Sequence, residues 1–319
     1  MKNLSFKRDL QNESTEFPHI SINKVGISNV LKKIEIIRGS FKLFINGDIS
    51  AYIYLPSTQR GIHMSRSAES IEDVINREAF TPVKSVEEFC SRIAISLLKE
   101  HKYTNHAEVE MSGVLILNSK VNERDQIQQS YEIYSNVKAD RLDNGDIKRS
   151  IQIGIWVEGM TVCPCAQEMS KEFAMEILSS RKDLNLQPEK IEKILNLIPI
   201  ATHNQRAKAQ IIIGNGNHEE ELVDVLELIK VIEKSMSAPV HSVLKRPDEA
   251  ELVRLAHLNP KFAEDVIREI AAKLASDKFK YISDHCTITI KIISYESIHH
   301  HNVYCELNTT FGDLRQQIK

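Results

Sequence analysis

The sequence has no long apolar run and only one tryptophan, and neither sign of charge dominates it. No stretch approaches the roughly 18–20 apolar residues of a membrane-spanning helix, and the polar first residues lack the apolar core of a signal peptide. Lys and Arg total 41 and Asp and Glu 44, so the net charge of −3 provides no general attraction to nucleic acid or anionic membranes. We expect a cytoplasmic protein that binds neither nucleic acid nor a membrane.

Cysteine is also scarce, and its number is odd. Without a secretory signal, an odd count favours reduced thiols over a disulfide framework. Two of these thiols are separated by one proline and are therefore candidates for metal binding or nucleophilic chemistry. The five cysteines are Cys90, Cys163, Cys165, Cys286 and Cys305.

The order of patterns along the 319 residues indicates two related α+β units. Residues 1–27 are polar and are predicted to form an arm. Strands, paired helices and strands then occur twice, so we predict units at 28–145 and 146–319, each an antiparallel sheet with helices on one face. The second unit is expected to carry a helical insert at about 171–202.

Local patterns in both units give more specific predictions. Asn46-Gly47 interrupts "FKLFINGDISAYIYLP" and is typical of a tight turn between two strands. Ser85 and Glu88 form a capping-box pattern that starts a helix, which places Cys90 in the core. Met169, Phe173 and Ile177 recur at intervals of four and predict one face of a helix.

The block "TVCPCAQEMS" (161–170) places Cys163 and Cys165 on either side of Pro164. In an extended segment these thiols share a face, with Cα atoms roughly 6.5–7 Å apart. One metal ligand with one neighbouring thiol is then easier to form than chelation by both. The structural alternative is a pair of small buried thiols at a strand-to-helix corner.

The block "ESIHHHN" (296–302) is the second dense group of polar side chains. On a strand, His299 and His301 would face one side and His300 the other. With Glu296 they offer a metal ligand, a proton shuttle and a carboxylate that orients them. A polar strand end whose histidines meet solvent is the alternative.

Six blocks taken together, in this order, resemble the type IB GTP cyclohydrolases and their archaeal relatives over nearly the full length. The resemblance implies a tunnelling fold of tandem sheet-and-helix units. It also implies self-association into homotetramers or homodimers, with active sites between subunits. The blocks are "YLP…GIHMSR" (54–66), "TVCPCAQEMS" (161–170), "HNQR" (203–206), "LKRPDE" (244–249), "NPKFAEDVIREIA" (259–271) and "ESIHHHN" (296–302).

The same resemblance implies a set of site residues. One divalent transition metal is expected in each active site, with iron(II) favoured and manganese(II) or zinc(II) as alternatives, and Cys165 would lie beside it without ligating. Glu264 corresponds to the residue that anchors guanine, and His301 and Glu296, with Cys163, to the catalytic groups. The implied metal ligands are Cys163, His203, Glu249 and His299. Candidates for binding the phosphates of GTP are His63, Arg66, Arg206, Lys245 and Arg246.

The reaction that the resemblance implies is opening of the guanine imidazole ring at C8, with that carbon released as formate. The 39 residues between Cys163 and His203 resemble the archaeal branch. The expected product of that branch is 7,8-dihydroneopterin 2′,3′-cyclic phosphate for methanopterin-type cofactors. The alternative is 7,8-dihydroneopterin triphosphate for folate, as in the bacterial branch.

Three other functions remain open from the residues. Nitrile reduction in queuosine synthesis would use a nucleophilic cysteine and a nicotinamide cofactor, and would leave His203, Glu249 and His299 without a joint purpose. A non-catalytic metal or purine binder would not need Glu296 and His301 as an acid–base pair. A structural zinc site would be closed by four protein ligands and would show no turnover.

Overall fold

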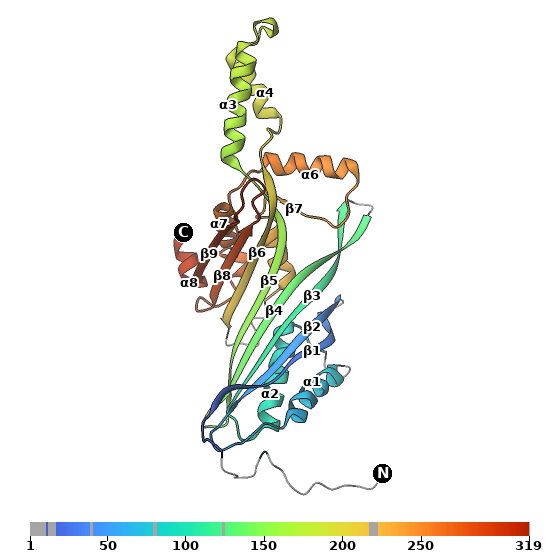
Figure 1. Cartoon of the computed structure of the whole chain (residues 1–319), viewed down its shortest axis with the longest axis vertical. Coiled ribbons are helices and arrows are strands. Elements are labelled where there is room, and N and C mark those ends of the chain that lie inside the picture. The colour runs from blue at the N-terminus through green and yellow to red at the C-terminus, as the bar shows by residue number, and fades with distance from the viewer. Residues whose placement is uncertain are drawn as a thin grey trace. The chain divides into compact units, whose positions relative to one another are not determined.

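A computed structural model describes residues 11, 17–38, 41–78, 82–122, 125–216 and 223–318. The chain divides into two compact units. Unit 1 comprises Met1–Leu117, Ser130–Gly154 and Ile213–Val223, and unit 2 comprises Asn118–Gln129, Ile155–Ile212 and Asp224–Lys319. Strands pair in the order β1-β2-β3-β4-β5-β6-β8-β9, with β7 paired to β5 (Figure 1).

Unit 1 is built from long strands and two helices. The wholly contained elements are β1 (Ile22–Arg38), β2 (Phe41–Leu55), α1 (Met64–Glu78) and α2 (Val86–Glu100). Three further strands, which also contribute residues to unit 2, are β3 (His106–Asn122), β4 (Asp125–Arg141) and β5 (Ile147–Val162). β2 pairs antiparallel with both β1 and β3.

The predicted turn at Asn46-Gly47 is wrong, because both residues lie inside the continuous strand β2. Gly47 pairs with Lys32 on one side and with Gly113 on the other. A Cβ at Gly47 would lie 2.9 Å from the Cδ1 of Ile34. The glycine therefore serves close packing within a central strand rather than a change of chain direction.

The helix start predicted at Ser85 is confirmed for α2. Ser85 is the N-cap, and its hydroxyl accepts a hydrogen bond from the Glu88 backbone N–H at 3.1 Å. The Glu88 carboxylate accepts from the Lys84 N–H at 2.8 Å. Lys84 precedes the N-cap, so this bond fixes the chain entering the helix and is not the return bond to Ser85 that a capping box makes. Cys90 is fully buried on this helix, as predicted.

Unit 2 contains the second group of helices and strands. Its helices are α3 (Pro164–Ser180), α4 (Pro188–Leu197), α5 (Val225–Glu233), α6 (Arg246–Leu258), α7 (Ala263–Leu274) and α8 (Phe311–Gln317). Its strands are β7 (Ala238–Pro239), β8 (Thr287–Ser294) and β9 (Val303–Thr310), together with most of β6 (Asn204–Gly216).

The core of unit 2 forms where α7 packs on β8 and β9 (Figure 1). Burial alternates along β8, so that Ile288, Ile290 and Ile292 face inward. From α7 the core receives Val266 and Ile270, both fully buried. The period-2 strand and the period-3.6 helix therefore present matching apolar faces.

α3 and α4 lie side by side as a helical hairpin (Figure 1). The helix predicted from Met169, Phe173 and Ile177 is α3, but these three side chains are exposed rather than packed. The hairpin instead buries Ile191 and Leu195 of α4. The spacing predicted the helix and could not identify which helix face would be covered.

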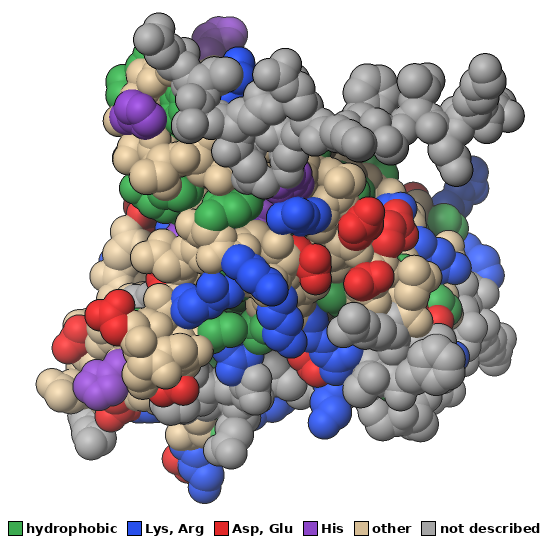
Figure 2. Space-filling model, turned by 90° about the horizontal axis from the view of Figure 1, so that it is seen from below, with side chains coloured by type: hydrophobic (Ala, Val, Ile, Leu, Met, Phe, Trp, Pro, Cys, Tyr) green, Lys and Arg blue, Asp and Glu red, His purple; other side chains and the backbone are tan. Residues whose placement is uncertain are grey.

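The α+β class and the antiparallel pairing are confirmed by these elements. The predicted unit boundaries at 28–145 and 146–319 stay a prediction, and more than half of the predicted arm, residues 1–27, lies outside the described residues. Among the described residues no helix is both long and apolar enough to cross a membrane. Figure 2 shows Lys and Arg side chains on one face with Asp and Glu beside them, so neither sign of charge covers it alone.

Candidate active site

Cys163 lies at the joint between β5 and α3. β5 ends at Val162, and Pro164 occupies the first position of α3, where a missing N–H costs nothing. Cys163 is the N-cap, and its sulfur accepts from the Ala166 N–H at 3.5 Å. Its side chain is partly buried, whereas Cys165 is exposed. Of the two thiols, only Cys163 is therefore built into the joint.

The segment that precedes β6 brings His203 to the same place. The Cys163 N–H donates to the His203 carbonyl at 3.2 Å. The Thr202 hydroxyl donates to the Cys163 carbonyl at 3.0 Å. These two bonds run in opposite directions between the segments, so the backbones of Cys163 and His203 lie side by side.

A buried polar group fixes the orientation of the His203 ring. The Oε1 of Gln205 lies 3.0 Å from the Nδ1 of His203. Because an amide oxygen only accepts hydrogen bonds, Nδ1 is the nitrogen that donates to Gln205, and Nε2 lies on the opposite side of the ring. This is the arrangement in which an outer residue orients a metal-ligating histidine.

Gln205 is held by hydroxyls and by Glu296. Its Nε2 lies 3.1 Å from the Thr161 hydroxyl, 3.2 Å from the Ser294 hydroxyl and 3.1 Å from the Glu296 Oε1. Ser294 also donates to the Glu296 Oε1 at 2.9 Å. The other oxygen of Glu296 lies 3.9 Å from the His203 Nδ1, and its side chain is only 9% exposed. A nearly buried carboxylate thus lies on the Nδ1 side of the candidate metal ligand His203.

The histidines of "ESIHHHN" lie in the loop between β8 and β9, not on a strand as predicted. His299 and His301 still face the same way, because their rings stack with centroids 5.1 Å apart. The His299 ring meets the His203 ring edge-on at 6.5 Å. Both loop histidines are exposed. The structure therefore brings together Cys163, His203, Glu296, His299 and His301.

The other predicted site residues of unit 2 are exposed. Glu249 is exposed in the first turn of α6, and Glu264 is exposed in the first turn of α7. Arg206 is exposed, with its guanidinium 3.7 Å from the Glu158 carboxylate. Lys245 and Arg246 are exposed at the start of α6. Over the described residues, no three His, Cys, Asp or Glu side chains are arranged to hold a metal ion.

Unit 1 contains a separate polar cluster around the predicted phosphate ligands His63 and Arg66. Arg66 donates to the Glu100 carbonyl at 3.3 Å. The fully buried His101 has the Ser67 hydroxyl 3.1 Å from Nε2 and the Tyr103 hydroxyl 2.8 Å from Nδ1. Burial lowers the pKa of His101 to about 4, and the charges of Arg66 and His63 add to this effect.

We expect this buried histidine to make stability fall in acid. The unfolded chain takes up a proton at an ordinary pKa near 6.5, whereas native His101 does so only near 4. The unfolded state therefore binds more protons in this interval, and the free energy of unfolding should decrease by roughly 2–3 kcal/mol as the pH falls from 7 to 4.5. Urea unfolding at the two pH values checks this, with His101→Gln expected to lose that part of the dependence. His285→Gln, at an exposed site, should leave it unchanged.

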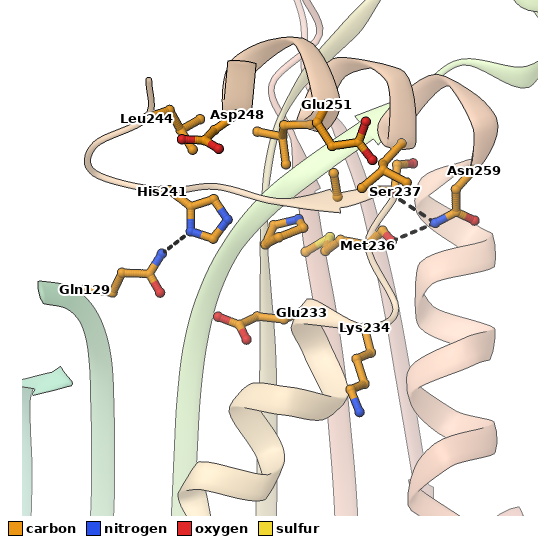
Figure 3. Close-up of a pocket in the computed structure, with 14 residues that line it drawn as sticks. Gln129, Glu233, Lys234, Met236, Ser237, His241, Leu244, Asp248, Glu251 and Asn259 are labelled. Carbon is orange, nitrogen blue, oxygen red and sulfur yellow. Dashed lines mark hydrogen bonds between the residues drawn. The ribbon is translucent and has the colours of Figure 1, made fainter. Parts of the chain in front are cut away.

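A pocket of about 590 Å³ lies under α6 in unit 2 (Figure 3). Asp248 and Glu251 border it from α6, and Gln129 donates to the His241 Nδ1 at 3.0 Å on its other side. Asn259 closes one end by donating to the Met236 and Ser237 carbonyls. Cys163, His203, Glu296, His299 and His301 are not among the residues that line it.

The sequence did not assign roles to Gln205, Thr161 or Ser294. Gln205 contacts the His203 ring, and Thr161 and Ser294 contact Gln205. A usable signal existed for two of them. Thr161 and Ser294 occupy buried positions near the ends of β5 and β8, on the strand faces that point inward. A buried hydroxyl at such a position requires a hydrogen-bond partner, which indicates a polar neighbour.

Comparison with known proteins shows similarity to GTP cyclohydrolases over almost the whole chain. A family model described as type I GTP cyclohydrolase folE2 matches residues 8–305. GTP cyclohydrolase MptA 2 of Methanocella arvoryzae is 38% identical over 301 residues, covering 94% of this chain and 95% of that protein. GTP cyclohydrolase MptA of Methanosphaera stadtmanae is 37% identical over 318 residues, covering 98% and 97%.

Among solved structures, uricase from Arthrobacter globiformis aligns with a TM-score of 0.47 at 10% identity, covering 90% of this chain and 93% of that chain. The sequence matches confirm the resemblance based on the six blocks. The chain belongs to the type I GTP cyclohydrolase folE2 family, a family of enzymes.

Proposed function

We propose that the protein is a metal-dependent GTP cyclohydrolase that opens the imidazole ring of GTP at C8 and releases formate. The product proposed is 7,8-dihydroneopterin 2′,3′-cyclic phosphate, for methanopterin-type cofactor synthesis. The relatives named GTP cyclohydrolase MptA support this assignment. The observation that carries it is the joining of Cys163 and His203 at the β5–α3 joint, with His299 and Glu296 beside them.

The side chains at this joint fit a divalent transition metal by their chemistry. Cys163 offers a thiol, and His203 and His299 offer imidazoles. The Nδ1–H of His203 is already engaged by Gln205, so its Nε2 is the nitrogen available as a ligand. Such a mixed sulfur and nitrogen set suits iron(II), manganese(II) or zinc(II), of which we favour iron(II). When bound, the metal would supply Lewis acidity for the hydrolytic steps.

Glu249 is the fourth ligand in this proposal, and Glu264 holds the guanine. The carboxylate of Glu264 can accept from the N1–H and the 2-amino group of guanine together, a pair of donors that adenine lacks. Both carboxylates are exposed on the single chain. We therefore propose a homotetramer or homodimer in which sites between subunits are completed on association. The phosphates of GTP would be bound by His63, Arg66, Arg206, Lys245 and Arg246.

Two groups are proposed to transfer protons. Glu296 is a buried carboxylate that accepts from Gln205 and Ser294 and borders His203. His301 stacks on His299 and is exposed to an incoming substrate. Water adds at C8 and the ring opens, and a second hydrolysis releases C8 as formate. Glu296 and His301 move protons to and from the ring nitrogens in these steps. The freed amino group then condenses with the rearranged ribose to close the pterin ring with loss of water. Attack of a hydroxyl of the neopterin side chain on the α-phosphate gives the cyclic phosphate and expels diphosphate.

Anaerobic turnover of metal-stripped protein with GTP carrying ¹³C at C8 tests the proposal. Protein reloaded with iron(II), manganese(II) or zinc(II) should release labelled formate, detected by NMR. Metal-free protein should release none. Mass spectrometry should identify the cyclic phosphate as the second product.

The outcomes separate the alternatives. Labelled formate together with 7,8-dihydroneopterin triphosphate would support ring opening at C8 but contradict the cyclic phosphate as the product. The product would then be the folate precursor. No labelled formate with any of the three metals, in protein shown to bind metal, would contradict catalysis and leave a metal or purine binder.

A further inference from the structure

We propose that Gln167 is a positioning residue, which holds the segment 200–203 against Cys163 so that the thiol and the His203 imidazole can bind one metal. The proposal rests on the proposed function. It concerns a residue outside the expected ligand set and outside the acid–base pair. Its support is a chain of hydrogen bonds that joins three parts of unit 2.

The segment 200–203 belongs to no helix or strand, although it carries a candidate ligand. It connects α4 to β6. Irregular backbone is positioned by the specific bonds that its carbonyl and N–H groups make. The Thr202 hydroxyl and the His203 carbonyl bond to Cys163. The position of His203 therefore also depends on the group that binds Ile200 at the start of this segment.

Gln167 provides that group from the first turn of α3. Its Nε2 donates to the Ile200 carbonyl at 3.0 Å and to the His257 carbonyl at 2.7 Å. An amide nitrogen has two hydrogens, so both are used. Its backbone N–H also bonds to the Cys163 carbonyl, at 3.3 Å. One residue thus connects the Cys163 joint, the segment 200–203 and the last turn of α6.

The last turn of α6 is a firm attachment point. The His257 side chain is 8% exposed, with Nδ1 2.8 Å from the Val253 carbonyl and Nε2 3.4 Å from the Thr202 carbonyl. Beyond it, the Lys261 N–H donates to the Val162 carbonyl at 3.0 Å, directly before Cys163. The segment that follows α6 thus bonds to Val162, and the last turn of α6 bonds to Gln167, so α6 is attached on both sides of Cys163.

Loss of the Gln167 amide should therefore loosen the ligand pair while the fold persists. Two carbonyls lose their donor, and the bonds of Thr202 and His203 to Cys163 remain. Outer residues that orient metal ligands typically change metal affinity or activity by about 10–100-fold. We expect an effect of this size on metal binding, with KM for GTP unchanged within about twofold, because Gln167 is not among the residues proposed to touch GTP.

Cobalt(II) titration of metal-stripped protein is the test, because thiolate-to-cobalt charge-transfer absorption reports Cys163 directly. Gln167→Leu should weaken cobalt binding about 10–100-fold and lower kcat in parallel. Amide hydrogen exchange over 200–203 should become faster in the metal-free protein. Gln187→Leu is the matched control, since Gln187 is exposed, belongs to the same hairpin and makes no side-chain cap bond. It should bind cobalt like the unaltered protein.

A second variant guards against simple unfolding. Gln167→Glu keeps the side-chain length but places oxygen atoms against two carbonyls, so it should reproduce the loss of cobalt affinity. Equal cobalt affinity in Gln167→Glu and the unaltered protein would overturn the positioning role. An unaltered protein without the thiolate absorption would instead overturn the metal site of the proposed function, and this inference with it.

Discussion

Cys163→Ser should reduce kcat by on the order of 10³-fold or more, equivalent to about 4 kcal/mol of transition-state stabilisation. Serine at an N-cap is among the preferred residues, and its hydroxyl can accept the Ala166 N–H in place of sulfur. Stability should therefore be kept. A hydroxyl is a poor replacement for a thiolate as a ligand of a divalent transition metal, so the metal content should fall with kcat.

The measurement is kcat for formate release together with metal per chain after reloading. Cys165→Ser provides a control of identical chemistry two residues away, at an exposed position. It should retain metal and activity. A larger loss in Cys165→Ser than in Cys163→Ser would mean that the second thiol is the ligand and would contradict the roles argued from their burial.

Glu296→Gln should lower kcat by about 10²–10⁴-fold, the usual contribution of a positioned acid–base group. The change preserves shape and an acceptor oxygen for Ser294 while removing the negative charge 3.9 Å from His203. Because the carboxylate is nearly buried, neither water nor salt will replace that charge effectively. We expect metal content to remain close to that of the unaltered protein.

Steady-state kinetics across pH on the metal-loaded protein would measure this effect. Glu306→Gln on β9 is the control, because that carboxylate is exposed and has no proposed role. A kcat within threefold of the unaltered protein would assign Glu296 to structure alone.

The sequence predicted best those features that depend on neighbours along the chain. The N-cap at Ser85 and the helix predicted from Met169, Phe173 and Ile177 are local, since a few adjacent residues decide them. The Asn46-Gly47 turn failed because the same dipeptide also fits a central strand when partners on both sides supply hydrogen bonds. Strand pairing is a long-range property, and local turn propensity cannot reveal it.

The candidate site shows the same division. The blocks that contain Cys163, His203 and His299 were visible as polar residues in unusual places. The partners that orient them come from distant parts of the chain. Gln205 meets Ser294 across 89 positions, and Gln167 meets His257 across 90. No spacing rule connects such residues, whereas each of these contacts follows from the fold.

The α3–α4 hairpin has a consequence for how this chain can vary. Residues 164–202, which number 39, leave the site at Cys163 and return to it at His203. The backbones of these two flanking residues are joined by a 3.2 Å hydrogen bond, so the segment is a loop whose two ends meet. The entropy of closing such a loop changes by only about 0.6 kcal/mol for each doubling of its length. Lengthening or shortening the hairpin tip should therefore have little thermodynamic effect on the thiol and imidazole at its base. Length variation between relatives can accumulate there without altering the chemistry.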